Sequence, residues 1–221
     1  MRAMTSNRRY YPVMLDLAGR TVLVAGGGEV ALRKVEGLVG AGAGCIRVVA
    51  PEISDEIRRA PGVECRRQAY DAAALDGAAL AIAATSSAEV NSRVAADCRS
   101  RGILCNVVDV PEECDFIVPS VLRQGPLVIA VSTGGASPRA AARIRRQIED
   151  HFGPAYGLWL DALGRLRQTV QRQVTDGPTR RKVFARLSEG DVLAAAEEGA
   201  AGLARKVNQI LTEFGLKEDA R

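Results

Sequence analysis

Residues Thr21–Lys34 read TVLVAGGGEVALRK, a continuous apolar run that stops at three glycines and restarts with helix-forming residues. This order predicts a β-strand, a tight turn and the first turn of an α-helix. Gly26 permits the sharp turn, Gly28 lets a pyrophosphate approach the backbone, and Ala31 packs the helix on the strand. The spacing is the G-x-G-x-x-A form of the dinucleotide fingerprint, in which the helix start near Glu29 directs free N–H groups at phosphates. A purely structural glycine turn is the alternative.

A second apolar run, Ile46–Ala50, follows after the glycine-rich segment Gly40–Gly44, which ends the intervening helix. Strand, helix and strand over this length form a βαβ unit. The acidic residue that usually binds the ribose is displaced, because the strand ends in Ala-Pro-Glu and Glu52 is the nearest carboxylate. Arg33 and Lys34 lie one turn into the helix, where a 2′-phosphate would reach them. NAD is therefore favoured over NADP only weakly.

The same alternation continues through the next sixty residues. It predicts strands at 63–70, 79–84 and 103–110 and a helix at 88–101. The fold class is α/β, with a Rossmann-like and mostly parallel sheet. Small polar residues follow the strand at 79–84, at the carboxyl edge where a dinucleotide would lie, and Thr85 is the expected second cofactor contact.

The parallel order is then interrupted. Two strands at 116–122 and 127–132 are joined by a short Gly-Pro turn, which predicts a hairpin. A glycine-rich bend follows, with Ser137 as the expected N-cap and Pro138 at the first helical position. Helices are expected at 138–151, 155–175, 178–188 and 190–214.

Two of these helices carry apolar stripes that something must cover, as a core or as a dimer seam. We therefore expect three parts and a homodimer. The parts are an NAD-binding Rossmann domain at 1–115, a hairpin and helix for dimerisation and the cleft at 116–150, and a helical C-terminal domain at 151–221.

The composition predicts a soluble globular protein rather than a membrane protein. The 221 residues are 47% hydrophobic and 25% charged, and no apolar run is long enough to span a membrane. Residues 1–9 lack the apolar centre of a signal peptide, so the cytoplasm is the expected location. Five cysteines without C-x-x-C spacing are expected to be reduced thiols. His151 is the single histidine, so no fixed metal centre is expected, and a charge partner for a helix C-terminus is its expected role.

The positive charge is concentrated in one segment. The net charge is +4, and residues 139–186 hold eleven basic and four acidic residues. Such a segment fits nucleic acid, a small molecule with many carboxylates or phosphates, or a solvated helix face.

Asp109 is the strongest candidate for acid-base chemistry. It ends the run Asn106-Val107-Val108-Asp109, at the carboxyl edge of the predicted sheet, where ligands of such folds bind. An aspartate at a strand end can instead cap the following turn. The sequence alone leaves both roles open.

Several motifs in register resemble the siroheme synthase N-terminal family: GGGEVALRK, AIAAT followed by Val90-Asn91, CNVVD, CDFIVPS and AVSTGGASP. The resemblance covers nearly the whole chain and is densest through residue 149. It implies precorrin-2 dehydrogenases, many of them also sirohydrochlorin ferrochelatases, and it implies that the basic segment serves a tetrapyrrole with eight carboxylates rather than nucleic acid or a membrane. The methyltransferase that many relatives carry is not implied.

The resemblance also implies roles for single residues. NAD-dependent oxidation of precorrin-2 to sirohydrochlorin, and proton removal for insertion of Fe²⁺ as a substrate, would use Asp109. The other implied contacts are, for the cofactor, Gly26, Gly27, Gly28, Glu29, Val30, Pro51 and Glu52, and, for the tetrapyrrole, Asn106, Ser120, Ser132, Thr133, Gly134, Gly135 and Arg139. Some relatives have a serine subject to phosphorylation where this chain has Thr133.

Two other classes of protein are alternatives to a precorrin-2 dehydrogenase. A non-catalytic NAD-sensing or tetrapyrrole-carrier module would bind the same ligands without turnover. A short-chain carbonyl reductase is excluded, because none of the four tyrosines is followed by lysine in a Tyr-x-x-x-Lys pair.

Overall fold

The computed structural model describes residues 9–217. The first eight residues, on which the expectation of no signal peptide mainly rests, lie outside the described part. The chain divides into two compact units, the first ending at Val118 and the second beginning at Pro119. Each unit has its own core and is described separately below. No helix in residues 9–217 is long and apolar enough to cross a membrane.

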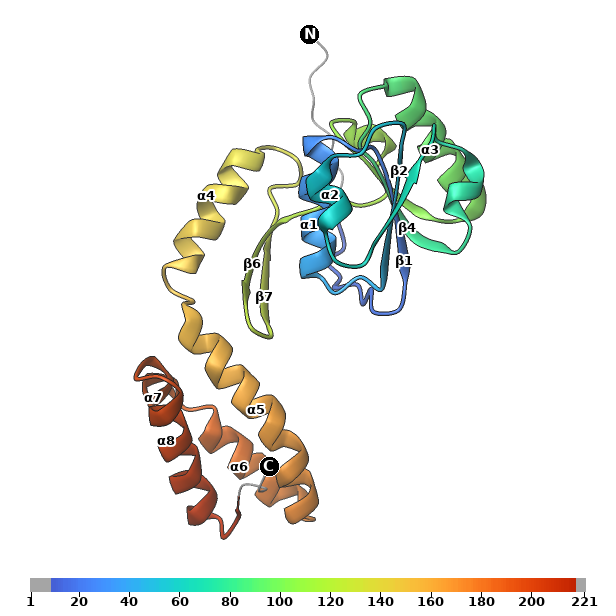
Figure 1. Cartoon of the computed structure of the whole chain (residues 1–221). Coiled ribbons are helices and arrows are strands. Elements are labelled where there is room, and N and C mark those ends of the chain that lie inside the picture. Colours follow the sequence, from blue (N-terminus) through green and yellow to red (C-terminus); the bar gives the residue numbers. More distant parts are fainter. Residues whose placement is uncertain (1–8, 218–221) are drawn as a thin grey trace. The chain divides into compact units, whose positions relative to one another are not determined.

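The first unit is an open α/β sheet with five parallel strands in the order β3-β2-β1-β4-β5 (Figure 1). Its elements are β1 (Thr21–Ala25), α1 (Glu29–Gly40), β2 (Cys45–Ala50), α2 (Asp55–Arg59), β3 (Val63–Arg67), the 3₁₀ helix η1 (Ala72–Leu75), β4 (Ala78–Ala83), α3 (Ala88–Arg101), β5 (Leu104–Val107) and the 3₁₀ helix η2 (Pro111–Glu113). The strand order reverses between β1 and β4, which is the position where ligands bind in such sheets.

Helices cover both faces of this sheet. Ala31, Val35 and Leu38 of α1 pack with Ile57 of α2 on one face, and α3 packs on the other through Val94, Ala95 and Cys98. Figure 1 shows α1 and α2 on the side of the sheet opposite α3. The central strands are buried on both faces, which explains why β1 and β4 have continuous apolar sequences instead of alternating ones. The predicted Rossmann-like fold is confirmed.

The ends of two strands and one short helix in this unit differ from the prediction. Strand β3 ends at Arg67, short of residue 70, and β5 ends at Val107, because the chain turns at Val108 and Asp109. The short helix α2 was not predicted, although Ser54 is a good N-cap and accepts from the Ile57 N–H at 3.4 Å.

The second unit contains a two-stranded antiparallel sheet and five helices among its described residues. They are β6 (Ser120–Gln124), β7 (Leu127–Val131), α4 (Pro138–Glu149), α5 (Pro154–Gln173), α6 (Gly177–Leu187), α7 (Gly190–Glu197) and α8 (Ala200–Glu213). The hairpin is as expected, but β6 begins at Ser120 rather than at 116. Phe116 belongs to the first unit, where its carbonyl accepts from the Asn106 side chain at 3.0 Å.

The single helix predicted over 190–214 is wrong, because the chain breaks between α7 and α8. Gly199 has a φ of +99° and a ψ of −178°, a conformation that is essentially restricted to glycine. The apolar spacing continued across this break and concealed it, since Ala196 and Leu203 both face the same core.

The two apolar stripes form an intramolecular core. Leu166 and Val170 of α5 pack with Val207 and Ile210 of α8, together with buried residues of α6 and α7. The core of the same chain is therefore one cover of these stripes.

Candidate functional site

The turn after β1 requires glycine at its first position, Gly26. Gly26 has a φ of +129°, and a Cβ atom there would lie 2.3 Å from the carbonyl oxygen of Ala84. The Gly26 N–H donates to the Val49 carbonyl at 3.0 Å. This glycine therefore makes the sharp turn that the sequence predicted, and it also lets β1 and β4 meet closely at their carboxyl ends.

The next two glycines have different environments. A Cβ at Gly27 would stand 2.0 Å from the Glu52 carbonyl oxygen, whereas a Cβ at Gly28 would meet nothing within 4 Å. Gly28 is also the N-cap of α1, and no side chain caps that helix start. The N–H groups of the first turn, which begins with Glu29 and Val30, are thus left for a ligand from outside the helix.

The end of β2 borders this turn. Pro51 and Glu52 are exposed directly after the strand. The Ser54 N–H donates to the Gly27 carbonyl at 3.0 Å, which ties the loop after β2 to the glycine turn. The expected adenosine-side residues therefore border the expected pyrophosphate site.

Thr85 follows β4 and is held by Asn91 of α3. The Thr85 N–H and hydroxyl donate to Asn91 Oδ1 at 3.0 and 2.7 Å, and Asn91 Nδ2 donates to the Thr85 carbonyl at 3.1 Å. Thr85 Oγ1 also accepts from the Ser87 N–H at 3.2 Å. The Thr85 hydroxyl thus shapes the turn between β4 and α3.

Asp109 lies in the turn that follows β5. Ala83 of β4 pairs with Val107 of β5, so Thr85 and Asp109 each come two residues after a paired strand end. Asp109 is exposed, has a φ of +62°, and is the one non-glycine residue with positive φ among residues 9–217. The turn is closed by the Val110 N–H, which donates to the Val107 carbonyl at 3.4 Å. Positive φ is uncommon for a non-glycine residue, although aspartate adopts it more readily than most.

Neighbouring strands lie about 4.8 Å apart, so the carboxyl ends of β1, β4 and β5 follow one another along a single edge. The glycine turn, Thr85 and Asp109 therefore share this edge on either side of the position where the strand order reverses. A carboxylate at such a place can accept a proton from a ligand that lies beside a bound dinucleotide.

A cation also lies within electrostatic range of Asp109. Burial lowers the pKa of Lys34 below its usual range, the charge of Arg33 lowers it further, and the negative charge of Asp109 opposes both effects. Lys34 is half-buried while Arg33 is exposed. Arg33 and Lys34 are the two basic residues expected near a 2′-phosphate. Of these, Lys34 interacts electrostatically with the carboxylate of Asp109.

Asn106 is buried inside the first unit. Its Nδ2 donates to the Phe116 carbonyl at 3.0 Å and to the Cys114 sulfur at 3.4 Å. Next to it, the Cys105 N–H donates to Asp115 Oδ2 at 2.9 Å, and the Asp115 N–H donates to the Cys105 carbonyl at the same distance. The returning chain is therefore attached to β5 over three residues. The structure gives Asn106 a structural role in this attachment.

The remaining predicted substrate residues belong to the second unit. Ser120 opens β6 and pairs with Val131. In the bend after β7, Ser132 Oγ accepts from the Gly134 N–H at 3.0 Å, and Thr133 Oγ1 accepts from the Ser137 N–H at 3.0 Å. Gly134 and Gly135 have φ values of +63° and +88°.

This bend leads into α4, whose N-cap is Ser137, as predicted. Arg139 in the first turn of α4 is exposed. Thr133 also donates from Oγ1 to the Ser137 carbonyl at 3.1 Å, so its hydroxyl is part of the helix start.

Two residues of the site were missed by sequence reasoning. Asn91 is not among the predicted site residues, although a polar residue in register with buried Val94, Ala95 and Cys98 on α3 is a sign of an internal hydrogen bond. Cys114 is predicted only as a reduced thiol, and nothing in its sequence context indicates that it contacts the Asp109 turn.

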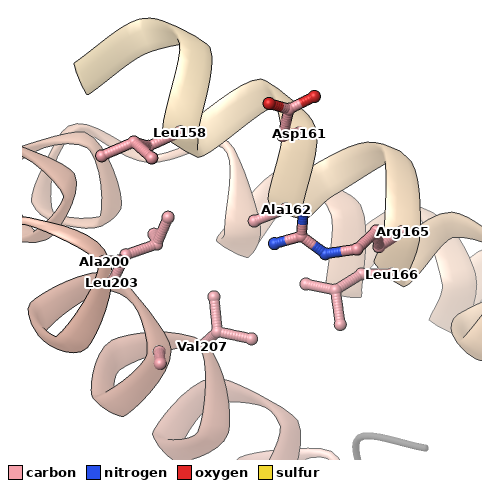
Figure 2. Close-up of a pocket in the computed structure, with 9 residues that line it drawn as sticks. Leu158, Asp161, Ala162, Arg165, Leu166, Ala200, Leu203 and Val207 are labelled. Atoms are coloured by element: carbon pink, nitrogen blue, oxygen red, sulfur yellow. The ribbon is translucent and has the colours of Figure 1, made fainter. Parts of the chain in front are cut away.

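No group of three or more His, Cys, Asp or Glu side chains within residues 9–217 could hold a metal ion. One pocket of about 120 Å³ lies between α5 and α8 and is lined mainly by apolar side chains, with Asp161 and Arg165 as its charged members (Figure 2). None of the predicted site residues lines this pocket.

Three family models match the chain in succession. A putative NAD(P)-binding domain matches residues 13–120, the central region of sirohaem biosynthesis proteins matches 124–151, and the sirohaem synthase dimerisation region matches 155–210. Together they cover most of the chain in the order expected for one family.

Relatives of known sequence agree with these matches. Siroheme synthase of Pseudomonas fluorescens (strain Pf0-1) is 39% identical over 206 residues, which are 92% of this chain and 44% of that protein. Siroheme synthase of Nitrosomonas europaea is 40% identical over 185 residues, which are 82% of this chain and 39% of that protein. The chain thus spans less than half the length of these curated relatives.

A solved structure is also similar. It is SirC, a precorrin-2 dehydrogenase, which is 26% identical, with a TM-score of 0.73 over 92% of this chain and 100% of that chain.

Proposed function

This chain belongs to the siroheme synthase family, and from that premise we propose that it oxidises precorrin-2 to sirohydrochlorin with NAD. The observation that carries the proposal is the position of Asp109, which stands in a left-handed turn on the same sheet edge as the glycine turn. Support comes from the similarity to SirC, a precorrin-2 dehydrogenase. The family model for the first unit covers NAD(P) binding, and the choice of NAD is part of the proposal.

For the cofactor, we propose that the uncapped start of α1 binds the pyrophosphate. Gly28 leaves room for it, and Glu29 and Val30 supply N–H groups of the first turn. Gly26 and Gly27 shape the turn, Pro51 and Glu52 lie on the adenosine side, and Thr85 lies beside the nicotinamide half. Bound NAD would supply the hydride acceptor.

For the chemistry, we propose that Asp109 is the general base. Oxidation of precorrin-2 removes a hydride from a ring carbon and a proton from a ring nitrogen, and the products are sirohydrochlorin, NADH and a proton. An exposed carboxylate directly after a strand can accept that proton and release it to water.

For the substrate, we propose that residues of the second unit contact the tetrapyrrole: Ser120, Ser132, Thr133, Gly134, Gly135 and Arg139. The basic segment 139–186 suits a ligand with eight carboxylates. For Asn106, which is buried, we propose an indirect role: it holds the returning chain on β5 through Cys114 and Phe116. We also propose a homodimer, because residues 155–210 match the dimerisation region of the family.

Insertion of Fe²⁺ into sirohydrochlorin is a second reaction that the family carries, with iron as a substrate. The carboxylate proposed as base would accept the pyrrole protons in that reaction as well. We treat this activity as an outcome of the test described next.

The test uses purified protein, anaerobically prepared precorrin-2 and NAD, without metal. The expected result is NADH formation in step with the sirohydrochlorin spectrum, with NADP as a poorer substitute. Tight binding of both ligands without turnover would overturn the proposal in favour of a carrier or sensor. Addition of Fe²⁺ to the finished reaction then determines whether metal insertion is catalysed.

A further inference from the structure

The sulfur of Cys114 lies inside the turn that carries Asp109. The Val107 N–H donates to Cys114 Sγ at 3.2 Å, and the single thiol proton faces two acceptors, the Val107 carbonyl at 3.1 Å and the Val110 carbonyl at 3.4 Å. Cys114 is 9% exposed. One side chain therefore contacts both the end of β5 and the far side of the turn, with Asp109 between them.

The surrounding contacts make this arrangement rigid. Asn106 Nδ2 donates to the same sulfur at 3.4 Å, and Cys105 and Asp115 exchange two hydrogen bonds next to it. The hydrogen bond that closes the turn itself, from the Val110 N–H to the Val107 carbonyl, is long at 3.4 Å. The thiol thus supplements a weak turn at the place where the backbone adopts an unfavourable conformation.

We propose that Cys114 is a positioning residue, whose thiol holds the Asp109 turn in its left-handed conformation and so fixes the carboxylate at the sheet edge. The inference rests on the proposed function for its catalytic consequence, because Asp109 must act as the base for its position to matter. A small displacement of a catalytic group is enough to lower a rate by roughly a hundredfold.

The chemistry of the side chain allows a graded test. Alanine at position 114 removes the donor and the acceptor together. Serine keeps both but has a shorter bond to its oxygen than cysteine has to its sulfur, so it restores only part of the contacts. Cys98 provides a control, because it is buried in the same apolar cluster and its thiol hydrogen-bonds Cys105 of β5 rather than a residue of the Asp109 turn.

The first measurement is amide hydrogen exchange in Cys114→Ala, Cys114→Ser and Cys98→Ala. We expect the Val107 and Val110 amides to exchange at least tenfold faster in Cys114→Ala, with an intermediate effect in Cys114→Ser and no local effect in Cys98→Ala. Unchanged protection of these two amides in Cys114→Ala would overturn the inference. This measurement needs neither cofactor nor substrate.

The second measurement is a double-mutant cycle on kcat with Asp109→Asn. We expect Cys114→Ala alone to lower kcat between tenfold and a hundredfold with the KM for NAD unchanged, and to lower it no further in the Asp109→Asn background. An equal loss in both backgrounds would assign Cys114 a merely structural role and contradict the inference. Absence of turnover in the wild-type protein would instead overturn the proposed function and the catalytic part of this inference. Hydrogen exchange would still test whether Cys114 stabilises the turn.

Discussion

The side-chain oxygen of Asn91 accepts from both the backbone N–H and the hydroxyl of Thr85, at 3.0 and 2.7 Å. Asn91 returns a hydrogen bond to the Thr85 carbonyl, so the pair closes the turn between β4 and α3. This turn forms the middle of the edge where the proposed cofactor lies. The buried side-chain amide of Asn91 therefore shapes the turn beside the proposed cofactor site.

Asn91→Ala is expected to destabilise the first unit by about 1–3 kcal/mol, because the half-buried N–H and carbonyl of Thr85 lose their partner while the hydroxyl keeps its contacts with Ser87. It should also raise the KM for NAD. Urea unfolding and steady-state kinetics measure the two effects. Thr85→Ser keeps the hydroxyl and should stay close to the wild type. Wild-type stability in Asn91→Ala would show that the network contributes little.

The glycine turn permits a test that separates folding from cofactor binding. Gly27→Ala would place a methyl group against the Glu52 carbonyl and should cost roughly 3 kcal/mol of stability. Gly28→Ala meets open space and has an ordinary extended backbone, so its stability should not change. If the pyrophosphate lies on Gly28, this second variant should nevertheless bind NAD at least tenfold more weakly. Normal NAD affinity in a folded Gly28→Ala would place the pyrophosphate elsewhere.

The break between α7 and α8 depends on one glycine. Gly199→Ala should destabilise the second unit by roughly 1–3 kcal/mol, because its φ of +99° is reserved for glycine. Gly190→Ala, at the first position of α7 and in open space, is the control and should be neutral or slightly stabilising. Thermal unfolding compares the two. Equal melting temperatures would indicate that α7 and α8 join into one helix at no cost.

The stability of the second unit should depend on pH through Asp191. Hydrogen bonds from Arg186 and then Lys206 hold the pKa of this carboxyl well below its usual range. A carboxyl with a lowered folded-state pKa stabilises the fold above its unfolded pKa of about 3.9 and loses that contribution as the pH falls toward the folded value. Asp191→Asn should therefore lower the melting temperature slightly at pH 7, and the difference from wild type should shrink below about pH 4. A difference that is constant with pH would exclude the charge as its source.

The sequence predicted the α/β unit well because its signals are local. Apolar runs of strand length and the glycines after β1 each act within a few residues. Gly26 could be identified for the same reason, since a sharp turn before a helix requires a residue that tolerates positive φ.

The parts that sequence reasoning missed depend on contacts between distant residues. The sequence predicts strands at 103–110 and 116–122 with a loop between them, but Cys114 and Asp115 fold back on β5 through hydrogen bonds that no local pattern encodes. The buried role of Asn106 has the same origin. The break at Gly199 is different, because its signal was present in the sequence and the apolar periodicity outweighed it.

The central claim is that Asp109 is the base for NAD-dependent oxidation of precorrin-2, and the most direct test is the single-turnover rate of Asp109→Asn. Asparagine tolerates the left-handed backbone and removes the ionised carboxylate, whereas alanine would add strain of about 1 kcal/mol at this position. We predict that Asp109→Asn binds NAD and precorrin-2 as the wild type does and forms NADH roughly a hundredfold to ten-thousandfold more slowly. A rate within a factor of about two of the wild type, with both ligands bound, would contradict this role and leave Asp109 as a turn residue.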